Sequence, residues 1–451
     1  MPPIPKKSTR FIAIETLCQL QRSRKPVNGL FTNLISQYKI SEADRQLATN
    51  IIYGILRLRQ SLDLILQELC TQPLTKLKPF VYQALTVGLY QLFFLDRIPE
   101  SAAVNESVKA LQAAHLPKKL QGFVNGVLRN SIRRRDELQS LLANSAQPIL
   151  NHPQWLSTRW QKRYGAEETI RICQQNNKQP PLTLQVNACR TERELLLQAL
   201  TAAGISSRKG IYSEDALILD DYHGGVNGLP GYSEGAFQVQ DQGAQLLARL
   251  FGPMTPQGEY LDGCAGVGGK TSVLLQLGQA VQARVFAVEP DKERRQTFQE
   301  NMTRLHPEQA VPLFSDSLQD FGAACQTRFH GILLDAPCSG TGVTGRHPDI
   351  RWNRRAEDLP SYQQTQLELL QTAASLLHPQ GILIYATCSL EEEENEEVIN
   401  CFLSAKPNFT RQDCSKFLPP AARSLIKNGY FAPLPGPDID GFFGARLVRE
   451  F

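Results

Sequence analysis

Two cysteines directly follow apolar runs of the chain and are candidates for a catalytic role. Cys338 lies in ILLDAPCSGTG, three residues after Asp335, and Cys388 lies in ILIYATCSL. A cysteine acts as a nucleophile through its thiolate. A thiolate that bonds to its substrate splits one difficult reaction into two easier steps. We therefore regard both thiols as candidates for covalent catalysis.

A glycine-rich stretch, YLDGCAGVGGKT at 260–271, is the third candidate. Its end matches a phosphate-binding loop, which reads Gly, four residues, Gly-Lys-Thr. Counted back from Gly269, however, the leading position falls on a cysteine, which weakens the ATP-binding alternative. We expect this loop to hold a different cofactor, through Cys264, Ala265, Gly266, Val267, Gly268, Gly269 and Lys270.

Glu289 helps to choose the cofactor, because it stands 289−268=21 residues after Gly268. Nucleoside-binding α/β folds place a ribose-binding carboxylate at about this distance. The dinucleotide pattern would need a third glycine where this chain has Thr271, so a pyrophosphate fits poorly. S-adenosylmethionine carries no phosphate, and its methionine carboxylate suits Lys270. The loop therefore predicts S-adenosylmethionine.

The elements that position these residues form an alternating pattern from about residue 236 onward. We expect strands near 258–263, 284–289, 310–315, 331–335 and 381–387, with helices between them and a last strand in GFFGARLVREF. This alternation predicts a mostly parallel sheet covered by helices, a Rossmann-like α/β domain over 236–451. Each candidate then ends a strand, where such sheets bind ligands: the glycine loop, Glu289, Asp316, Asp335 with Cys338, and Cys388.

The first part of the chain has a different pattern. Apolar residues at helical spacing, interrupted by prolines, predict an all-α domain over 1–145. The stretch 141–153 reads as a linker, and 150–235 reads as a small α+β module that links or binds RNA. Within this module, Thr191 and Glu194 predict a capping box at a helix start.

Charge and composition narrow the partners and the compartment. The net charge is +4, but residues 1–150 carry 20 basic against 10 acidic residues, which points to a polyanion such as RNA. Ten cysteines without a CxxC spacing, and no signal peptide, favour the cytoplasm. We expect no membrane span, no metal site and a monomer. The acidic run 391–397 reads as a solvated helix start.

A methyltransferase needs a nucleophilic cysteine only where its target carbon is hard to methylate directly. Cytosine C5 is such a carbon, because it is a weak nucleophile in the intact ring. A thiolate that adds to C6 makes C5 enamine-like and reactive. The pyrimidine must also leave its stack to be reached. The two thiols beside the expected cofactor therefore favour a cytosine substrate.

The motifs CAGVGGKT, ILLDAPCSGTGV, RHPDIRW, YATCSL and DGFFGARL together resemble the Sun-domain family of RNA cytosine-C5 methyltransferases. The N-terminal stretches FVYQALTVGLYQLFFLDRIP and GFVNGVLRN are similar to the NusB RNA-binding fold. The resemblance covers nearly the whole chain. The pairing of the two implies a bacterial enzyme acting on one cytosine of 16S ribosomal RNA.

The resemblance also implies a role for each candidate residue. Cys388 would be the nucleophile, and Cys338 would assist release of the enzyme–RNA adduct. Asp335 would hydrogen-bond the cytosine ring near the methionine end of S-adenosylmethionine. The loop Cys264–Lys270 would hold the cofactor, with Glu289 and Asp316 facing its ribose and adenine.

Two departures and three alternatives accompany this interpretation. The family usually has Ala-Pro in place of Gly266-Val267, and often a bulkier residue in place of Gly444. The first departure predicts a more flexible loop and weaker cofactor binding. The alternatives are a transfer RNA substrate, a non-catalytic RNA-binding ribosome-assembly factor, and an ATPase.

Overall fold

The computed structural model describes residues 8–38, 40–145 and 151–450, and it divides the chain into two compact units. The first unit comprises residues 1–179 together with 344–354, and the second comprises 180–343 with 355–451. Part of the linker predicted at 141–153, residues 146–150, lies outside the described residues. The segment 344–354 is therefore separated in sequence from the rest of the unit to which it belongs.

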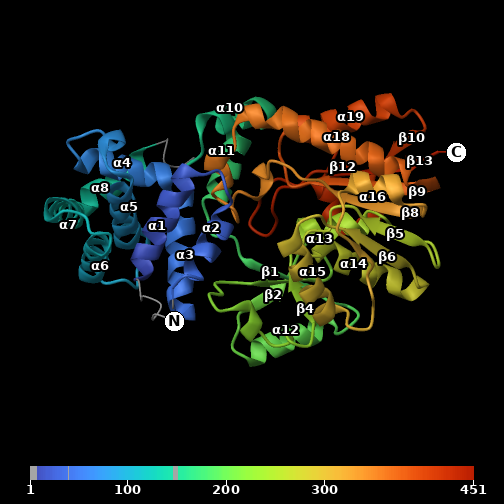
Figure 1. The fold of residues 1–451 in the computed structure, drawn as a ribbon, viewed down its shortest axis with the longest axis horizontal. Coiled ribbons are helices and arrows are strands. Elements are labelled where there is room, and N and C mark those ends of the chain that lie inside the picture. The colour runs from blue at the N-terminus through green and yellow to red at the C-terminus, as the bar shows by residue number, and fades with distance from the viewer. Residues whose placement is uncertain (1–7, 39, 146–150, 451) are drawn as a thin grey trace. The chain divides into compact units, whose positions relative to one another are not determined.

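The first unit is helical, as predicted (Figure 1). Four of its helices follow a proline directly and a fifth begins at Pro79, because proline suits the start of a helix. The helices are α1 (Thr9–Arg22), α2 (Val27–Ile35), α3 (Glu42–Arg57), α4 (Arg59–Leu69), α5 (Pro79–Phe94), α6 (Glu100–Ala113), α7 (Lys118–Arg133), α8 (Arg135–Asn144), α10 (Gln154–Tyr164) and α11 (Ala166–Asn176).

Segment 344–354 completes this unit through buried polar contacts. Arg351, which lies in the short helix α17 (Ile350–Asn353), is only 1% exposed. Its guanidinium donates to the carbonyl oxygens of Arg57 at 3.3 Å and Asn151 at 3.2 Å. The indole Nε1 of Trp352 donates to the carbonyl oxygen of Leu56 at 2.8 Å. The segment is therefore anchored to the end of α3 and to Asn151, which lies just before α10.

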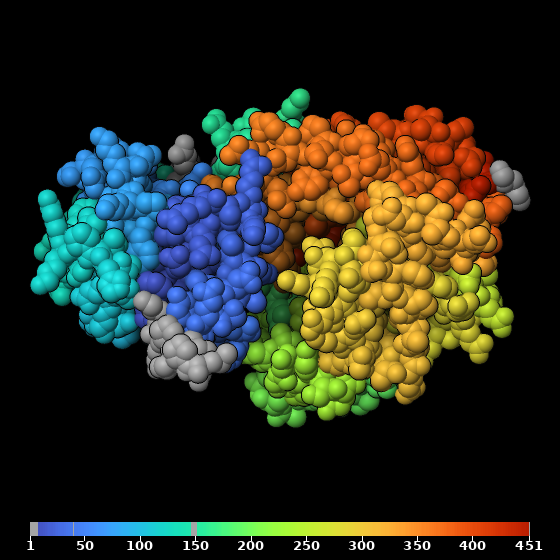
Figure 2. All heavy atoms as spheres, viewed as in Figure 1, coloured from blue at the N-terminus to red at the C-terminus, as the bar shows by residue number. Residues whose placement is uncertain are grey.

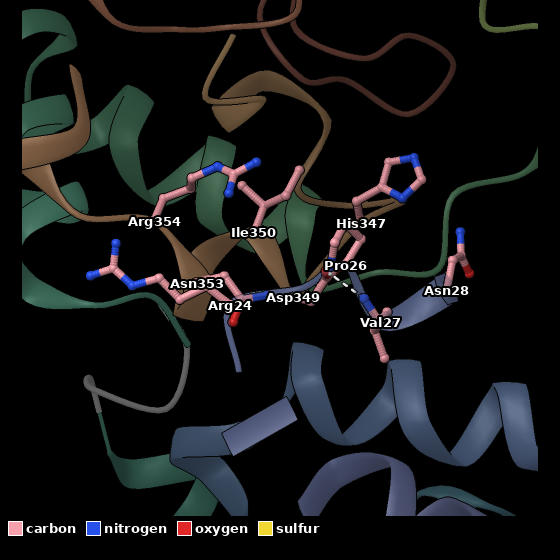
Figure 3. Close-up of a pocket in the computed structure, with 9 residues that line it drawn as sticks. All are labelled: Arg24, Pro26, Val27, Asn28, His347, Asp349, Ile350, Asn353 and Arg354. Carbon is pink, nitrogen blue, oxygen red and sulfur yellow. Dashed lines mark hydrogen bonds between the residues drawn. The ribbon is translucent and has the colours of Figure 1, made fainter. Parts of the chain in front are cut away.

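A cavity of about 140 Å³ lies beside this segment (Figure 3). At its floor, Asp349 accepts a hydrogen bond from the backbone N–H of Val27 at 3.1 Å and so caps α2. Arg24 and Arg354 bring positive charge to its wall. The lining residues are Arg24, Pro26, Val27, Asn28, His347, Asp349, Ile350, Asn353 and Arg354.

The second unit begins with a small antiparallel sheet of order β2-β3-β1-β4. Its strands are β1 (Leu182–Val186), β2 (Ser207–Lys209), β3 (Ala216–Leu219) and β4 (Phe237–Val239), with helix α12 (Arg193–Ala202) beside them. The capping box predicted for α12 is wrong, because Glu192 is the N-cap and no side chain bonds there. Glu194 instead forms an ion pair with Lys209.

The large sheet has the order β11-β12-β13-β9-β8-β5-β6-β7, and β10 pairs with β13. Strands β5 to β9 run parallel and β13 runs antiparallel to β9. The first strand, β5, lies between β6 and β8, so the strand order reverses there and a ligand crevice is expected at its carboxyl end. The strands are β5 (Glu259–Asp262), β6 (Arg284–Val288), β7 (Leu313–Phe314), β8 (Phe329–Asp335), β9 (Leu377–Thr387), β10 (Phe409–Gln412), β11 (Ile426–Lys427), β12 (Tyr430–Phe431) and β13 (Phe443–Arg449).

Helices cover both faces of this sheet, because alternate strand residues point to opposite sides. Tyr260 and Leu333 face a core shared with α13 (Gln242–Arg249), α14 (Gly269–Gly278) and α15 (Lys292–Leu305). Leu261 and Leu334 face a second core shared with α16 (Leu318–Ala324), α18 (Leu359–Ser375) and α19 (Glu396–Ala405). In the space-filling view, α18 and α19 form one continuous orange and red-orange surface (Figure 2).

Candidate active site

The glycine loop joins the end of β5 to α14, and backbone bonds hold it in place. Ala265 N donates to the carbonyl oxygen of Val288 at 3.0 Å, and Gly268 N donates to that of Ala265 at 2.9 Å. Gly268 has φ +88°, and a Cβ there would lie 2.8 Å from Met302. Gly266 has φ +56°, and its missing Cβ would meet no atom within 4 Å. The loop is therefore packed against α15 at Gly268 and open at Gly266.

Glu289 lies directly after β6, against the glycine loop. Its Oε2 accepts from the backbone N–H of Gly266 at 2.9 Å, and its Oε1 accepts from Asp291 N at 2.8 Å. The structure thus brings Glu289 to the loop that the sequence paired it with. Asp316 follows β7 and is exposed at the same edge of the sheet. The ribose and adenine roles of these carboxylates stay predictions.

Lys270 and Asp335 form an ion pair across the carboxyl ends of β5 and β8, with Nζ 2.5 Å from Oδ2. Burial lowers the pKa of Lys270, but the charge and hydrogen bond of Asp335 more than offset it, and the net shift is upward. Lys270 is therefore a permanent cation beside the residue expected to bind the cytosine ring.

Asp262, the last residue of β5, is a candidate site residue that the sequence analysis missed. It is 1% exposed, and its Oδ2 accepts from Thr271 Oγ1 at 2.7 Å. Its other oxygen, Oδ1, has no hydrogen-bond partner among the described residues. Burial raises the pKa of Asp262 to about 6. The signal in the sequence was an acidic residue at a strand end, directly before the loop.

Cys338 and Cys388 lie side by side, with Sγ atoms 3.3 Å apart, although fifty positions separate them. Both are half-buried, at the carboxyl ends of β8 and β9. The hydrogen bond with Cys388 and burial raise the pKa of the Cys338 thiol well above its usual range. Cys338 therefore holds its proton next to Cys388. This pairing joins two candidates that the sequence could only place at one edge.

Three other cysteines pack in the cores, as their type favours. Cys18, Cys173 and Cys414 are buried, and burial raises the pKa of Cys18 and of Cys173 to about 12. Such thiols stay protonated and unreactive near neutral pH. Burial therefore argues against these three thiols as nucleophiles, whereas Cys338 and Cys388 are only half-buried.

Two backbone hydrogen bonds close the cysteine loops together. Gly342 N donates to the carbonyl oxygen of Cys388 at 2.9 Å, and Gly441 N donates to that of Gly342 at 2.9 Å. A Cβ at Gly342 would lie 2.3 Å from the carbonyl oxygen of Gly441, so only glycine fits this approach. Gly444, the second departure from the family, packs as closely: a Cβ there would lie 2.6 Å from Leu247.

The acidic run 391–397 contains the start of α19 (Glu396–Ala405), as predicted, but the run is only partly solvated, which corrects that part of the sequence interpretation. Glu394 is 0% exposed and Asn395 is 1% exposed, while Glu392 and Glu397 face solvent. Asn395 Nδ2 donates to the carbonyl oxygen of Ser389 at 2.9 Å. The run therefore contributes buried side chains directly behind the cysteines.

The small antiparallel sheet reaches the glycine loop through buried glutamines. Gln238 of β4 donates to the carbonyl oxygen of Gly269 at 2.8 Å and to Gln185 Oε1 of β1 at 2.8 Å. Gln185 in turn donates to Gln276 of α14 at 3.1 Å. The small sheet thus supports the first turn of α14.

The residues of the site fit S-adenosylmethionine as a cofactor. The loop is open at Gly266, and Asp262, directly before the loop, has a buried oxygen for which the described residues provide no hydrogen-bond donor. An open glycine loop with nearby carboxylates suits a nucleoside with a cationic tail and no phosphate. The fold and the open glycine loop therefore define a Rossmann-like methyltransferase domain, with two paired thiols at the carboxyl ends of its strands.

Comparison with known proteins gives the family. Residues 252–448 match the family 16S rRNA methyltransferase RsmB/F, residues 7–133 match the NusB family, and residues 152–224 match the RsmF/B-like ferredoxin-like domain. The chain is 33% identical to probable ribosomal RNA small subunit methyltransferase B of Bacillus subtilis, over 99% of each chain. It is 35% identical to ribosomal RNA small subunit methyltransferase B of Escherichia coli, again over 99% of each.

The crystal structure of PH0851 has a similar fold, with a TM-score of 0.77 and 21% sequence identity. The match covers 99% of this chain and 100% of the PH0851 chain. The chain belongs to the 16S rRNA methyltransferase RsmB/F family. It is an S-adenosylmethionine-dependent RNA methyltransferase, and the resemblance to the Sun/Fmu enzymes, the three-part fold and the cofactor are confirmed. The assembly-factor and ATPase alternatives are thereby set aside.

The domain boundaries at 1–145, 150–235 and 236–451 stay a prediction. The ferredoxin-like match over 152–224 spans α10 and α11 of the first unit as well as β1 to β3 of the second. Among the described residues, no helix has the length and apolar content needed to cross a membrane.

Proposed function

We propose that this enzyme methylates C5 of one cytosine in 16S ribosomal RNA, with Cys388 as the covalent nucleophile. The observation that carries the proposal is the 3.3 Å separation of the Cys388 and Cys338 sulfurs at the cofactor edge of the sheet. Two thiols at this distance can act on neighbouring atoms of one pyrimidine ring. The names of the similar enzymes support a small-subunit ribosomal RNA target.

The residues of the chain divide the chemistry between them. The Cys388 thiolate adds to C6 and makes C5 electron-rich. S-adenosylmethionine, when bound, supplies the methyl group. Transfer of the C5 proton to a water molecule then lets the C6–S bond break, so that the Cys388 sulfur leaves as a thiolate and the ring is aromatic again. Cys338, whose pKa is held high beside Cys388, is suited to handling a proton at the release step. Asp335 would hydrogen-bond the cytosine ring.

The cofactor would be held by residues of three strand ends. Cys264 to Lys270 would approach it through their backbone, which Gly266 leaves open. Glu289 and Asp316 would face ribose and adenine, and Asp262 joins this set because its buried Oδ1 lacks a partner among the described residues. Lys270 would lie near the methionine carboxylate while it neutralises Asp335.

The helical unit would bind RNA through α7. Lys118, Lys119, Arg129 and Arg133 are exposed on this helix. On the same helix, a Cβ added at Gly122 or Gly126 would meet no atom within 4 Å, so a phosphate backbone could approach closely. Cations that face solvent on one element supply the salt-dependent part of RNA affinity. We infer that the enzyme works as a monomer on ribosomal RNA in the cytoplasm, where its cysteines stay reduced.

A trapping experiment tests the proposal. Cys388→Ala is expected to abolish both methylation and the denaturant-resistant protein–RNA adduct, whereas Cys338→Ala is expected to accumulate that adduct on 16S RNA. Cys401→Ala, an exposed cysteine on α19, serves as the matched control and should behave like the wild type. Full activity of Cys388→Ala would overturn the proposal. Bisulfite mapping of RNA from cells without the enzyme identifies the cytosine, and a missing mark on transfer RNA alone would overturn the substrate.

A further inference from the structure

Glu394 is a buried carboxylate directly behind the two cysteines. It ends the short turn η6 (Glu392–Glu394) between β9 and α19 and is 0% exposed. Its backbone is held as well, since Tyr385 OH donates to the carbonyl oxygen of Glu394 at 2.6 Å. A buried carboxylate is costly unless hydrogen bonds satisfy it, so its contacts indicate what it does.

Four hydrogen bonds reach this carboxylate. Oε1 accepts from the backbone N–H of Ser339 at 2.8 Å and from Gln366 Nε2 at 3.1 Å. Oε2 accepts from Ser389 Oγ at 2.5 Å and from the Ser339 hydroxyl. Burial raises the pKa of Glu394 above its usual value, and these hydrogen bonds oppose that rise without cancelling it. An ionised carboxylate is the side chain that can accept at four positions and donate at none.

The donors come from both cysteine loops. Ser339 is the residue after Cys338, and Ser389 is the residue after Cys388. The two hydroxyls also lie 3.1 Å from each other. The Glu394 side chain therefore accepts hydrogen bonds from the residue that follows each of the two cysteines.

We propose that Glu394 is a positioning residue that fixes the separation of the Cys338 and Cys388 sulfurs. The inference rests on the proposed function, because that separation matters only if both thiols act on one ring. Gln366 supports the arrangement, since its Nε2 also donates to the carbonyl oxygen of Pro337 at 2.9 Å, next to Cys338. A misplacement of about 1 Å can slow an enzyme by about a hundred-fold.

Substitutions of Glu394 separate positioning from simple filling of space. Glu394→Gln keeps the volume but removes the negative charge from all four hydrogen bonds and replaces one of the two acceptor oxygens by an NH₂ donor, so the donors at that position lose their acceptor. Glu394→Asp keeps both oxygens but is one methylene shorter and cannot reach both loops. Both variants should lower kcat by about a hundred-fold, with the KM for RNA and the affinity for S-adenosylmethionine unchanged. Glu392→Gln, an exposed residue of the same run, is the matched control.

A dithiol probe measures the sulfur separation without any methylation. Phenylarsine oxide binds two adjacent thiols, forming two As–S bonds and releasing water. In the wild-type enzyme and in Glu392→Gln it should protect Cys338 and Cys388 from maleimide, as read by peptide mass spectrometry. In Glu394→Gln this protection should be lost while the thermal unfolding curve stays cooperative. If Glu394→Gln does not fold, Ser389→Ala, which removes one hydroxyl donor, takes its place and should show weakened protection.

Unchanged protection together with unchanged kcat in the folded variant would overturn the inference. A fall in kcat with a matching fall in RNA or cofactor affinity would also overturn it, because positioning affects only the reacting step. The probe reports on the thiols even if Cys388 is not the nucleophile. A failure of the proposed function, seen as active Cys388→Ala, is therefore distinguishable from a failure of this inference.

Discussion

The Lys270 ammonium lies 2.5 Å from Oδ2 of Asp335, so the first turn of α14 is tied to the end of β8. Sequence analysis assigned these residues to different ligands, the cofactor carboxylate and the cytosine ring. Their pairing means that the charge expected to bind one ligand is balanced by the residue expected to bind the other. Binding of the cofactor is thus expected to change the affinity for the cytosine base, and the reverse, through this ion pair.

Breaking this pair from one side should cost more than removing both charges. Lys270→Met leaves the Asp335 carboxylate without its cation and should lower the free energy of unfolding by about 2 kcal/mol, since the pair is only partly buried. Adding Asp335→Asn should restore part of this loss. Urea unfolding of both single variants and the double variant measures the coupling. Additive losses would show that the two residues do not stabilise each other.

The stability of the enzyme should depend on pH through Asp262. Its pKa is about 6 in the folded enzyme and about 3.9 in an unfolded chain, so the folded state holds the proton more tightly. The stability contributed by this proton is present in the acid range and is lost as pH rises from about 4 to about 6, by up to about 3 kcal/mol. Asp262→Asn cannot titrate. Its stability relative to the wild type should therefore rise over that window and stay constant above it, which urea unfolding at pH 4 to 8 tests. A constant difference across the window would contradict the assignment.

Two glycines of the loop should respond differently to alanine. Gly266→Ala meets open space, so only the left-handed backbone resists it, at about 1 kcal/mol. Gly268→Ala adds a clash with Met302 and Phe298 and should cost more. Chemical unfolding measures both, and calorimetry with S-adenosylmethionine reports the effect on the loop. Equal losses at the two positions would show that the packing against α15 does not matter.

RNA binding should depend on salt through the basic residues of α7. Replacing Lys118 and Lys119 together by glutamine removes two phosphate contacts and should reduce the slope of log affinity against log salt by about 2. Filter binding to 16S RNA at several salt concentrations measures the slope. Arg328→Gln with Arg423→Gln removes the same charge from exposed positions of the second unit and serves as control. An equal decrease of the slope in the control variant would show that α7 does not contact the RNA.

Much of this fold could be predicted from local patterns. The helices predicted between the strands are present, α15 (Lys292–Leu305) among them, and the strand-end positions of the candidates followed from the alternation. The strand predicted at 310–315 is shorter, with only Leu313–Phe314 paired, because β7 is an edge strand with one neighbour. Edge pairing depends on a partner strand, which local sequence does not specify.

What the sequence hid depends on contacts between distant residues. A run of six glutamates and one asparagine reads as solvated, yet Glu394 is buried because donors from two loops and from α18 converge on it. The capping box failed because Lys209, on a neighbouring strand, attracts Glu194 away from the helix start. In both cases the partner lies outside the sequence window on which the prediction relied.

Segment 344–354 limits how this enzyme can be dissected. A fragment that starts at residue 236 would keep Arg351 and Trp352 but lose the carbonyl oxygens that their nitrogens bond in the helical unit. An isolated catalytic fragment would thus carry an uncovered indole and an unmatched guanidinium. Expressed separately, the helical fragment is expected to be incomplete and the catalytic fragment to aggregate. Folded enzyme is expected only when the two fragments are produced together.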